Sequence, residues 1–191
     1  FKPGKLLLQT LEYATDQLGR VFEREMAENK ITHLATHDTL TGLPSLILGT
    51  DRLSHAITVA RRTKTKGGLM FMDLDGFKLI NDTHGHAAGD QVLKEFGMRL
   101  VSVVRGADTV ARIGGDEFVV VLGGLDDRRG AETVAQKVIQ LMSSPISYMD
   151  LNLHLGVSIG IAIFPDNGCD ASFLLNQADK AMYEVKNSSK N

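Results

Sequence analysis

Four carboxylates at two places in the sequence have the spacing and the neighbours that metal chemistry requires. Asp73 and Asp75 end the apolar run 69–74, and Asp116 and Glu117 directly follow two glycines. Residues two apart on a strand lie on the same face, so the first pair should point to one side. Unpaired carboxylates at the end of a buried strand are costly, and a bound cation is the obvious compensation. Several oxygen ligands of this kind suit Mg²⁺.

Three further polar side chains follow the first carboxylate pair. Lys78 is close enough in sequence to supply positive charge to a polyphosphate. Asn81 and Asp90 carry an amide and a carboxylate that complement the donors and acceptors of a purine edge. Metal ions in such a site can activate a hydroxyl and stabilise a leaving oxygen in nucleotidyl transfer. The residues therefore favour a metal-dependent enzyme that acts on nucleotides.

The second carboxylate pair lies at the turn of a predicted hairpin. A Gly-Gly pair at 114–115 separates two apolar, β-branched runs, 110–113 and 118–122. A tight hairpin turn needs positive φ angles, which glycine adopts without a Cβ penalty. The two acids are consecutive, so they share a face only if the turn distorts the strand. Taken alone the turn is more simply a solvent-exposed acidic turn, and it becomes a site only beside the strand that ends at Asp73.

The remaining pattern predicts an α+β fold, with a single mixed, mainly antiparallel sheet of about five strands covered by helices and preceded by a long helix. Expected helices cover about 50–65, the segment after Asp90 to Val103, 131–143, and a last helix capped by Asp170 with an inner stripe of Leu174, Ala178, Ala181, Met182 and Val185. A small hairpin is expected at 147–155 and a strand at 157–164. Gly67-Gly68 is expected to close the first of these helices, and Gly123-Gly124 to break the chain after the acidic hairpin.

The first 36 residues are expected to form one long helix, from about Lys5 to Ala35. An a/d stripe of barely three heptads is formed by Leu7, Leu11, Ala14, Leu18 and Val21. Glu25 and Glu28 interrupt it. The stripe fits either a parallel dimer contact or the last helix of a preceding domain. We favour a signalling connector at 1–36, at the end of an upstream sensory domain, followed by a second domain at 37–191.

Composition excludes several classes of protein. The chain has 191 residues, 43% apolar and 23% charged, and a net charge of -2, which gives no indication of nucleic-acid binding. Cys169 is the only cysteine, so an internal disulfide is impossible and a cytoplasmic location is expected. No apolar run of this sequence has the length of a membrane span, and its pattern leads us to expect no signal peptide within it. Because the chain starts at Phe1, we expect a fragment of a longer protein, whose other parts could attach it to a membrane.

The segment Arg112–Phe118, Arg-Ile-Gly-Gly-Asp-Glu-Phe, resembles the defining motif of the GGDEF-domain diguanylate cyclases. Other segments are similar to further motifs of that family, in the family's order: Asp38–Pro44, 71–78, Asn81-Asp82, His84–Asp90 and Ala178–Tyr183. The resemblance covers roughly residues 37 to 191, so chance is a poor explanation. It implies a palm-like nucleotidyl cyclase fold.

The resemblance also implies a reaction. Such enzymes condense two GTP molecules into cyclic di-GMP and two pyrophosphates with Mg²⁺ or Mn²⁺, each 3′-hydroxyl attacking the α-phosphate of the other GTP across an antiparallel homodimer. By the same resemblance, Asp73, the Leu74 carbonyl and Asp116 hold metal, Asp116 is also the base, and Glu117 supports the metal site. Lys78 stabilises charge on the phosphates.

The remaining roles concern the nucleotide and its product. The resemblance implies that Asn81 and Asp90 recognise guanine, that His86 lines the nucleotide site, and that Lys186 contacts phosphate. It also implies an inhibitory product site at Arg105 and Asp108, where arginine can bind a phosphate or a guanine edge in bidentate fashion.

Two departures from the family pattern stand out. Ser45-Leu46 replaces the usual Asn-Arg, and Lys190 replaces a phosphate-contacting arginine, which keeps the charge but loses the bidentate fork. The main alternative function is a non-catalytic receptor for GTP or cyclic di-GMP, although a pure receptor has no need of metal ligands. Another metal-dependent nucleotidyl enzyme is a second alternative, and the pair Asn81 and Asp90 disfavours it.

Overall fold

The structure is a computed structural model that describes the main chain of residues 3–188 and the side chains of residues 17–28 and 30–188. The chain divides into two compact units, residues 1–36 and residues 37–191. None of the described helices is long and apolar enough to cross a membrane. Lys190 and the two residues beside it lie outside the described residues.

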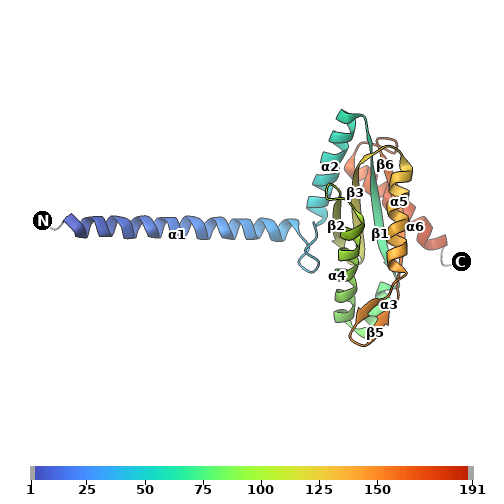
Figure 1. Ribbon diagram of the computed structural model, residues 1–191, viewed down its shortest axis with the longest axis horizontal. Coiled ribbons are helices and arrows are strands. Elements are labelled where there is room, and N and C mark those ends of the chain that lie inside the picture. The colour runs from blue at the N-terminus through green and yellow to red at the C-terminus, as the bar shows by residue number, and fades with distance from the viewer. Residues whose placement is uncertain (1–2, 189–191) are drawn as a thin grey trace. The chain divides into compact units, whose positions relative to one another are not determined.

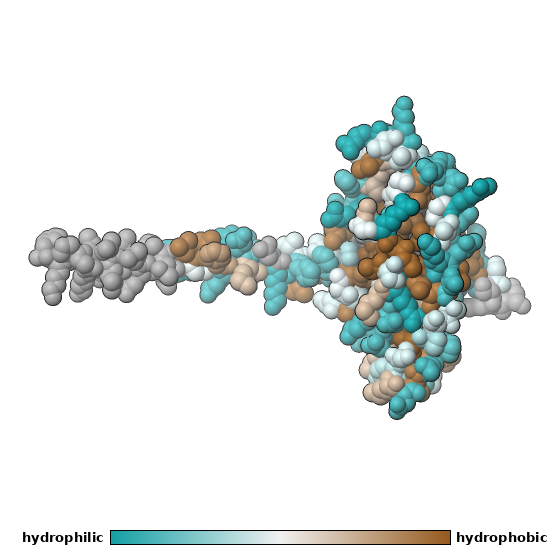
Figure 2. Space-filling model, in the orientation of Figure 1, coloured by the Kyte–Doolittle hydropathy of each residue, from teal (hydrophilic) through white to brown (hydrophobic). Residues whose placement is uncertain are grey.

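The first unit is a single helix, α1 (Pro3–Thr36), which confirms the predicted helix and extends it at both ends. The exposed apolar residues of its described part include Val21 and also Leu18, Phe22 and Met26, which follow one another at intervals of four residues. Such residues lie on one face of a helix. This apolar face is exposed next to the grey segment in Figure 2. The residues of the stripe before position 17 lie outside the described side chains.

The second unit is built on one antiparallel sheet in the strand order β2-β3-β1-β6. Its strands are β1 (Lys66–Asp75), β2 (Thr109–Gly114), β3 (Glu117–Leu125) and β6 (Gly156–Phe164). Two short strands, β4 (Ile146–Tyr148) and β5 (Leu151–Leu153), form a separate hairpin. The predicted α+β fold is confirmed. The main sheet has four strands rather than about five, since the small hairpin does not join it.

Helices cover both faces of the sheet (Figure 1). They are α2 (Leu46–Thr63) and α6 (Ala171–Ser188) on one face, α4 (His86–Val103) and α5 (Arg128–Met142) on the other, and the short α3 (Phe77–His84) after β1. Alternate β1 residues pack into the two cores: Leu69 and Phe71 toward α2 and α6, Met70 and Met72 toward α4 and α5. This burial on both faces explains the continuous apolar run in β1.

Two predictions about glycine pairs are wrong. The left-handed residue that closes α2 is Lys64, with φ 56°, whereas Gly67-Gly68 belongs to β1. A Cβ on Gly67 would lie 2.1 Å from the ring of Phe164, so a glycine is needed there for close packing. The pair Gly123-Gly124 does not break the chain either, because β3 continues to Leu125 through a shift in its register with β1.

The predictions for the helices need three further corrections. Helix α2 begins at Leu46 rather than near residue 50, and α3 occupies residues where only a polar, glycine-punctuated stretch was expected. No residue of α3 is fully buried, although Phe77 and Ile80 pack against the core from one face of this eight-residue helix. Val185 on α6 is exposed rather than inward. The cap of α6 is confirmed, since Asp170 accepts a hydrogen bond of 2.8 Å from the main-chain N–H of Phe173.

Candidate active site

The two carboxylate pairs meet at one end of the sheet, as the sequence predicts. Strands β1 and β3 pair so that Asp73 lies directly opposite Glu117. On the other side of β1, Ser158 lies opposite Asp73 and its hydroxyl donates to Asp75 at 2.8 Å. Residues directly opposite each other in a sheet share a face. Asp73, Asp75 and Glu117 therefore lie on the face that α6 covers.

Asp73 is the most enclosed of these acids. Only 8% of the residue is exposed, and its carboxylate accepts a hydrogen bond from Lys186 on α6. Helix α6 reaches this position because it packs on β6 at Gly160, where a Cβ would lie 2.0 Å from the carbonyl oxygen of Ala178. The close approach of helix and strand thus brings an ammonium group onto the end of β1.

The acids at the turn lie in an unfavourable electrostatic environment. Burial, followed by the charge of Asp73, raises the pKa of the Asp116 carboxyl. Burial raises the pKa of Glu117 as well, with further contributions from Asp73, Asp179 and Asp116. Both turn acids thus feel the charge of Asp73, although they are consecutive in sequence. The glycine turn, which shifts the register between β2 and β3, lets them both approach it.

The ammonium group of Lys186 responds to the same negative charges, with an opposite consequence for its stability. Burial alone would lower the pKa of this ammonium group, but its hydrogen bond to Asp73 and the charges of Asp73, Asp116 and Asp75 raise the pKa overall. Negative charge is therefore concentrated at this end of the sheet, and a cation is stabilised there.

The donor set fits a cation that arrives together with a nucleotide. Within the described residues, no three His, Cys, Asp or Glu side chains are gathered into a preformed metal cage. Mg²⁺ does not require one, since it usually keeps several waters and binds one or two carboxylates plus substrate phosphates. Asp73 and Glu117, facing each other across two strands, supply such carboxylates, with Asp116 beside them. Leu74 lies within β1 next to Asp73 and is buried.

The α3–α4 segment holds the residues predicted to recognise guanine. Asn81 on α3 packs against Gly89 on α4, where a Cβ would lie 2.1 Å from the Asn81 side-chain oxygen. That oxygen is buried and has no hydrogen-bond partner among the described residues. A buried acceptor without a donor costs about 1–3 kcal/mol, which a ligand N–H would relieve. Asp90, His86 and Lys78 are exposed on the same two helices.

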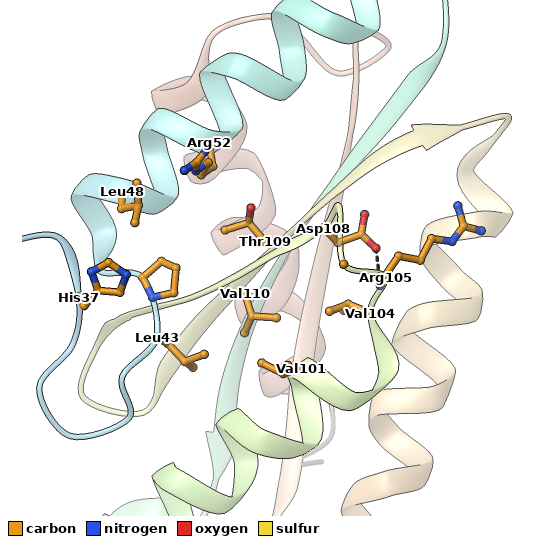
Figure 3. A pocket seen from close by; sticks show the side chains of 12 residues that line it. His37, Leu43, Leu48, Arg52, Val101, Val104, Arg105, Asp108, Thr109 and Val110 are labelled. Carbon is orange, nitrogen blue, oxygen red and sulfur yellow. Dashed lines mark hydrogen bonds between the residues drawn. The ribbon is translucent and has the colours of Figure 1, made fainter. Parts of the chain in front are cut away.

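The turn Arg105–Asp108 borders three cavities, of about 360, 390 and 680 Å³. The Asp108 carboxylate is fixed by the main-chain N–H groups of Arg105 (2.9 Å) and Gly123 (3.2 Å). In Figure 3 the Arg105 side chain extends away from Arg52 and the cavity drawn there. In the part of the chain that the structure describes, its guanidinium makes no hydrogen bond or ion pair.

Sequence reasoning missed one contact at the site. Arg112 joins the turn to Asp38, near the start of the second unit, through side-chain hydrogen bonds. Asp38 does bond its local turn as predicted, accepting from the Thr41 N–H at 2.8 Å. No sequence signal indicated the longer contact, because the two partners are 74 residues apart.

Comparison with known proteins places this site in a family. The family profile described as "Diguanylate cyclase, GGDEF domain" matches residues 35–191. The chain belongs to the GGDEF diguanylate cyclase family. It is 40% identical over 181 residues to MucR of Pseudomonas aeruginosa, a bifunctional diguanylate cyclase/cyclic di-GMP phosphodiesterase. The aligned region covers 95% of this chain and 26% of MucR.

Solved structures agree with this assignment. The GGDEF domain of TpbB (YfiN) from Pseudomonas aeruginosa has a TM-score of 0.78 at 40% identity, covering 80% of this chain and 89% of that one. The coiled coil and GGDEF domain of DgcB from Caulobacter crescentus, solved with c-di-GMP, has a TM-score of 0.80 at 27% identity and 95% coverage of each. The chain spans less than half the length of the curated relatives MucR and TpbB.

Proposed function

We propose that residues 37–191 form an active diguanylate cyclase domain, which condenses two GTP molecules into cyclic di-GMP and two pyrophosphates. The observation that carries this proposal is the pairing of Asp73 with Glu117 across β1 and β3, with Asp116 at the adjoining turn. This arrangement gathers acidic oxygens at the end of a rigid sheet, which is what a phosphate-bound cation requires.

Asp73, the Leu74 carbonyl, Asp116 and Glu117 would hold Mg²⁺ or Mn²⁺. The metal, when bound, supplies charge stabilisation for the oxygens that react. Asp116 takes the proton from the 3′-hydroxyl of GTP. In the metal-free chain, burial and the charge of Asp73 raise the pKa of Asp116. Metal binding offsets the same repulsion, because it brings positive charge among these acids.

The nucleotide is held by residues on both sides of the acids. The unpartnered Asn81 oxygen accepts from a guanine N–H, and the exposed Asp90 carboxylate accepts from a second donor on the same edge. His86 lines the nucleotide site at the start of α4. Lys78 and Lys186 neutralise phosphate charge. Lys186 supports this assignment, since its ammonium already lies beside Asp73.

One chain provides half of the reaction site. Each 3′-hydroxyl attacks the α-phosphate of a GTP held by a second chain, so turnover requires an antiparallel homodimer. The exposed apolar face of α1 is suited to bring two chains together, and the solved structure of DgcB comprises a coiled coil and a GGDEF domain. Residues 1–36 would then link the cyclase to an upstream sensory domain of the full protein, with the cyclase in the cytoplasm.

Arg105 and Asp108 form an inhibitory site for the product. The Arg105 guanidinium can bind a phosphate or guanine edge, and the fixed Asp108 carboxylate can accept from guanine. The cavities beside this turn provide the space. The second candidate, a non-catalytic receptor, rests on the same turn and cavities and would bind cyclic di-GMP without making it.

The experiment is to incubate the chain with GTP and Mg²⁺ and to identify the nucleotides by chromatography and mass. An active domain yields two pyrophosphates for each molecule of cyclic di-GMP that it forms. Absence of product at high protein concentration, with GTP or cyclic di-GMP still bound, would contradict the cyclase and favour the receptor.

A further inference from the structure

The Arg112 guanidinium connects two segments that are distant in the sequence. One terminal nitrogen donates to both carboxylate oxygens of Asp38, at 2.9 and 3.0 Å. Nε and the other terminal nitrogen donate to the main-chain carbonyl of Gly115, at 3.1 and 2.7 Å. The two charged side chains are only 11% and 23% exposed. Charge-assisted bonds of this enclosed kind are among the stronger ones in proteins.

The Asp38 end of this connection is itself fixed. Its carboxylate accepts from the N–H and the hydroxyl of Thr41, at 2.8 and 2.6 Å, and its own N–H donates to the Leu43 carbonyl at 2.8 Å. A main-chain hydrogen bond joins the same two segments, since the Arg112 N–H donates to the Pro44 carbonyl at 2.9 Å. Asp38 is thus a rigid anchor, two residues after the end of α1.

The Gly115 end controls the orientation of Asp116. The Gly115 carbonyl and the Asp116 N–H belong to one planar peptide group, so fixing the oxygen fixes that plane. The turn needs such a restraint, because Gly115 has φ 52° and lies in a Gly-Gly pair with wide conformational freedom. The strand ladder flanks the turn at the pair Gly114 and Glu117, after a register shift between Arg112 and Gly114, but Gly115 itself has no partner in that ladder.

We propose that Arg112 and Asp38 are positioning residues for the reaction: their clamp holds the Gly115 peptide so that Asp116 faces Asp73, and it ties that orientation to the segment after α1. Neither residue touches the reacting atoms. This inference rests on the proposed cyclase activity. It also gives a physical route by which a displacement of residues 37–44 would change the geometry at Asp116.

The test compares the variants Arg112→Lys and Asp38→Asn with a control ion pair on the same sheet. A lysine keeps the charge but cannot bond both Asp38 and Gly115. The control variants are Lys66→Gln and Asp166→Asn, which break an ion pair about 23 Å along β1 from Asp73, at 3.3 Å per residue.

We expect kcat to fall about tenfold or more in each clamp variant while KM for GTP changes less than about twofold, because a displacement of 1 Å can cost about a hundredfold in rate. The double variant should be no worse than the worse single one, since both act through one clamp. Losses below threefold, additive losses, or an equal loss in the control variants would overturn the proposal.

Hydrogen exchange provides a readout that does not depend on activity. The peptide 113–117 should exchange faster in the clamp variants than in the wild-type chain and in the control variants, and unchanged exchange would overturn the clamp. If the wild-type chain makes no cyclic di-GMP, the proposed function fails while this measurement still tests the clamp. Should Arg112→Lys not fold, Thr41→Val removes one donor to Asp38 and should give a smaller change in the same direction.

Discussion

Replacing Gly160 by alanine should separate α6 from the sheet. The new Cβ would lie 2.0 Å from the Ala178 carbonyl oxygen and 2.3 Å from the Met182 nitrogen. Carbon–oxygen contacts normally begin near 3.3 Å, so the helix must move by about 1.3 Å. Both obstructing atoms belong to the main chain of α6, and no rotamer change can relieve the overlap. Lys186 would move with the helix, away from Asp73.

The expected cost follows from this geometry. Overpacking a well-filled core typically costs about 1–3 kcal/mol, and an obstruction by main-chain atoms belongs at the upper end. A loss of about 3 kcal/mol corresponds to a decrease of about 6–12 °C in melting temperature for a domain of this size. Circular dichroism during heating and urea unfolding both measure it.

Gly123→Ala is the matched control. Gly123 also lies in a strand, but nothing lies within 4 Å of its added Cβ and its φ is not positive. A change within about 0.5 kcal/mol is expected for it. If Gly160→Ala melts within about 2 °C of Gly123→Ala, the close seating of α6 on β6 is wrong.

Four further predictions concern the site. Asp116→Asn should abolish turnover without lowering the melting temperature at pH 7. Burial and Asp73 raise the pKa of Asp116, so its negative charge disfavours folding at any pH above that pKa. Retained turnover would contradict the role of Asp116. Burial acts to raise the pKa of Asp38, but the hydrogen bonds from Thr41 and Arg112 prevail and lower it. The charged Asp38 therefore stabilises the fold above about pH 3.9, and this stabilisation is lost as the pH falls below that value. In Asp38→Asn, the free energy of unfolding should depend less on pH in this range. Gly89→Ala should displace the Asn81 oxygen and raise KM for GTP about tenfold with little change in melting, and an unchanged KM would remove Asn81 from guanine binding. Arg105→Ala should relieve inhibition by added cyclic di-GMP in a rate assay, and an unchanged inhibition curve would exclude the product site.

The sequence predicted the site where local chemistry determined it. The apolar run that ends at Asp73 predicted a buried strand, and the glycine turn before Asp116 predicted a hairpin that becomes a site only if it lies beside that strand. Their meeting is confirmed, but the register that places Asp73 opposite Glu117 depends on packing along both strands. Sequence patterns do not set such a register when both faces are apolar.

The errors share a physical cause. Gly67 and Gly68 resemble a helix stop, yet Gly67 serves close packing against Phe164, nearly 100 positions away, and Gly68 lies close to Ala131 and Leu125, which only the fold reveals. Helix α3 was missed because it has only eight residues and packs only Phe77 and Ile80 against the core, too few for a helical period to stand out in the sequence. The contact between Arg112 and Asp38 is likewise tertiary and leaves no periodic trace in the sequence.

The most direct test of the cyclase assignment measures the initial rate of cyclic di-GMP formation from GTP and Mg²⁺ as a function of chain concentration. Two half-sites must meet, so the rate per chain should rise with concentration until dimers predominate, with two pyrophosphates released for each cyclic di-GMP. No cyclic di-GMP at any concentration, or a rate per chain that is constant down to concentrations where the chains are monomeric, would contradict it.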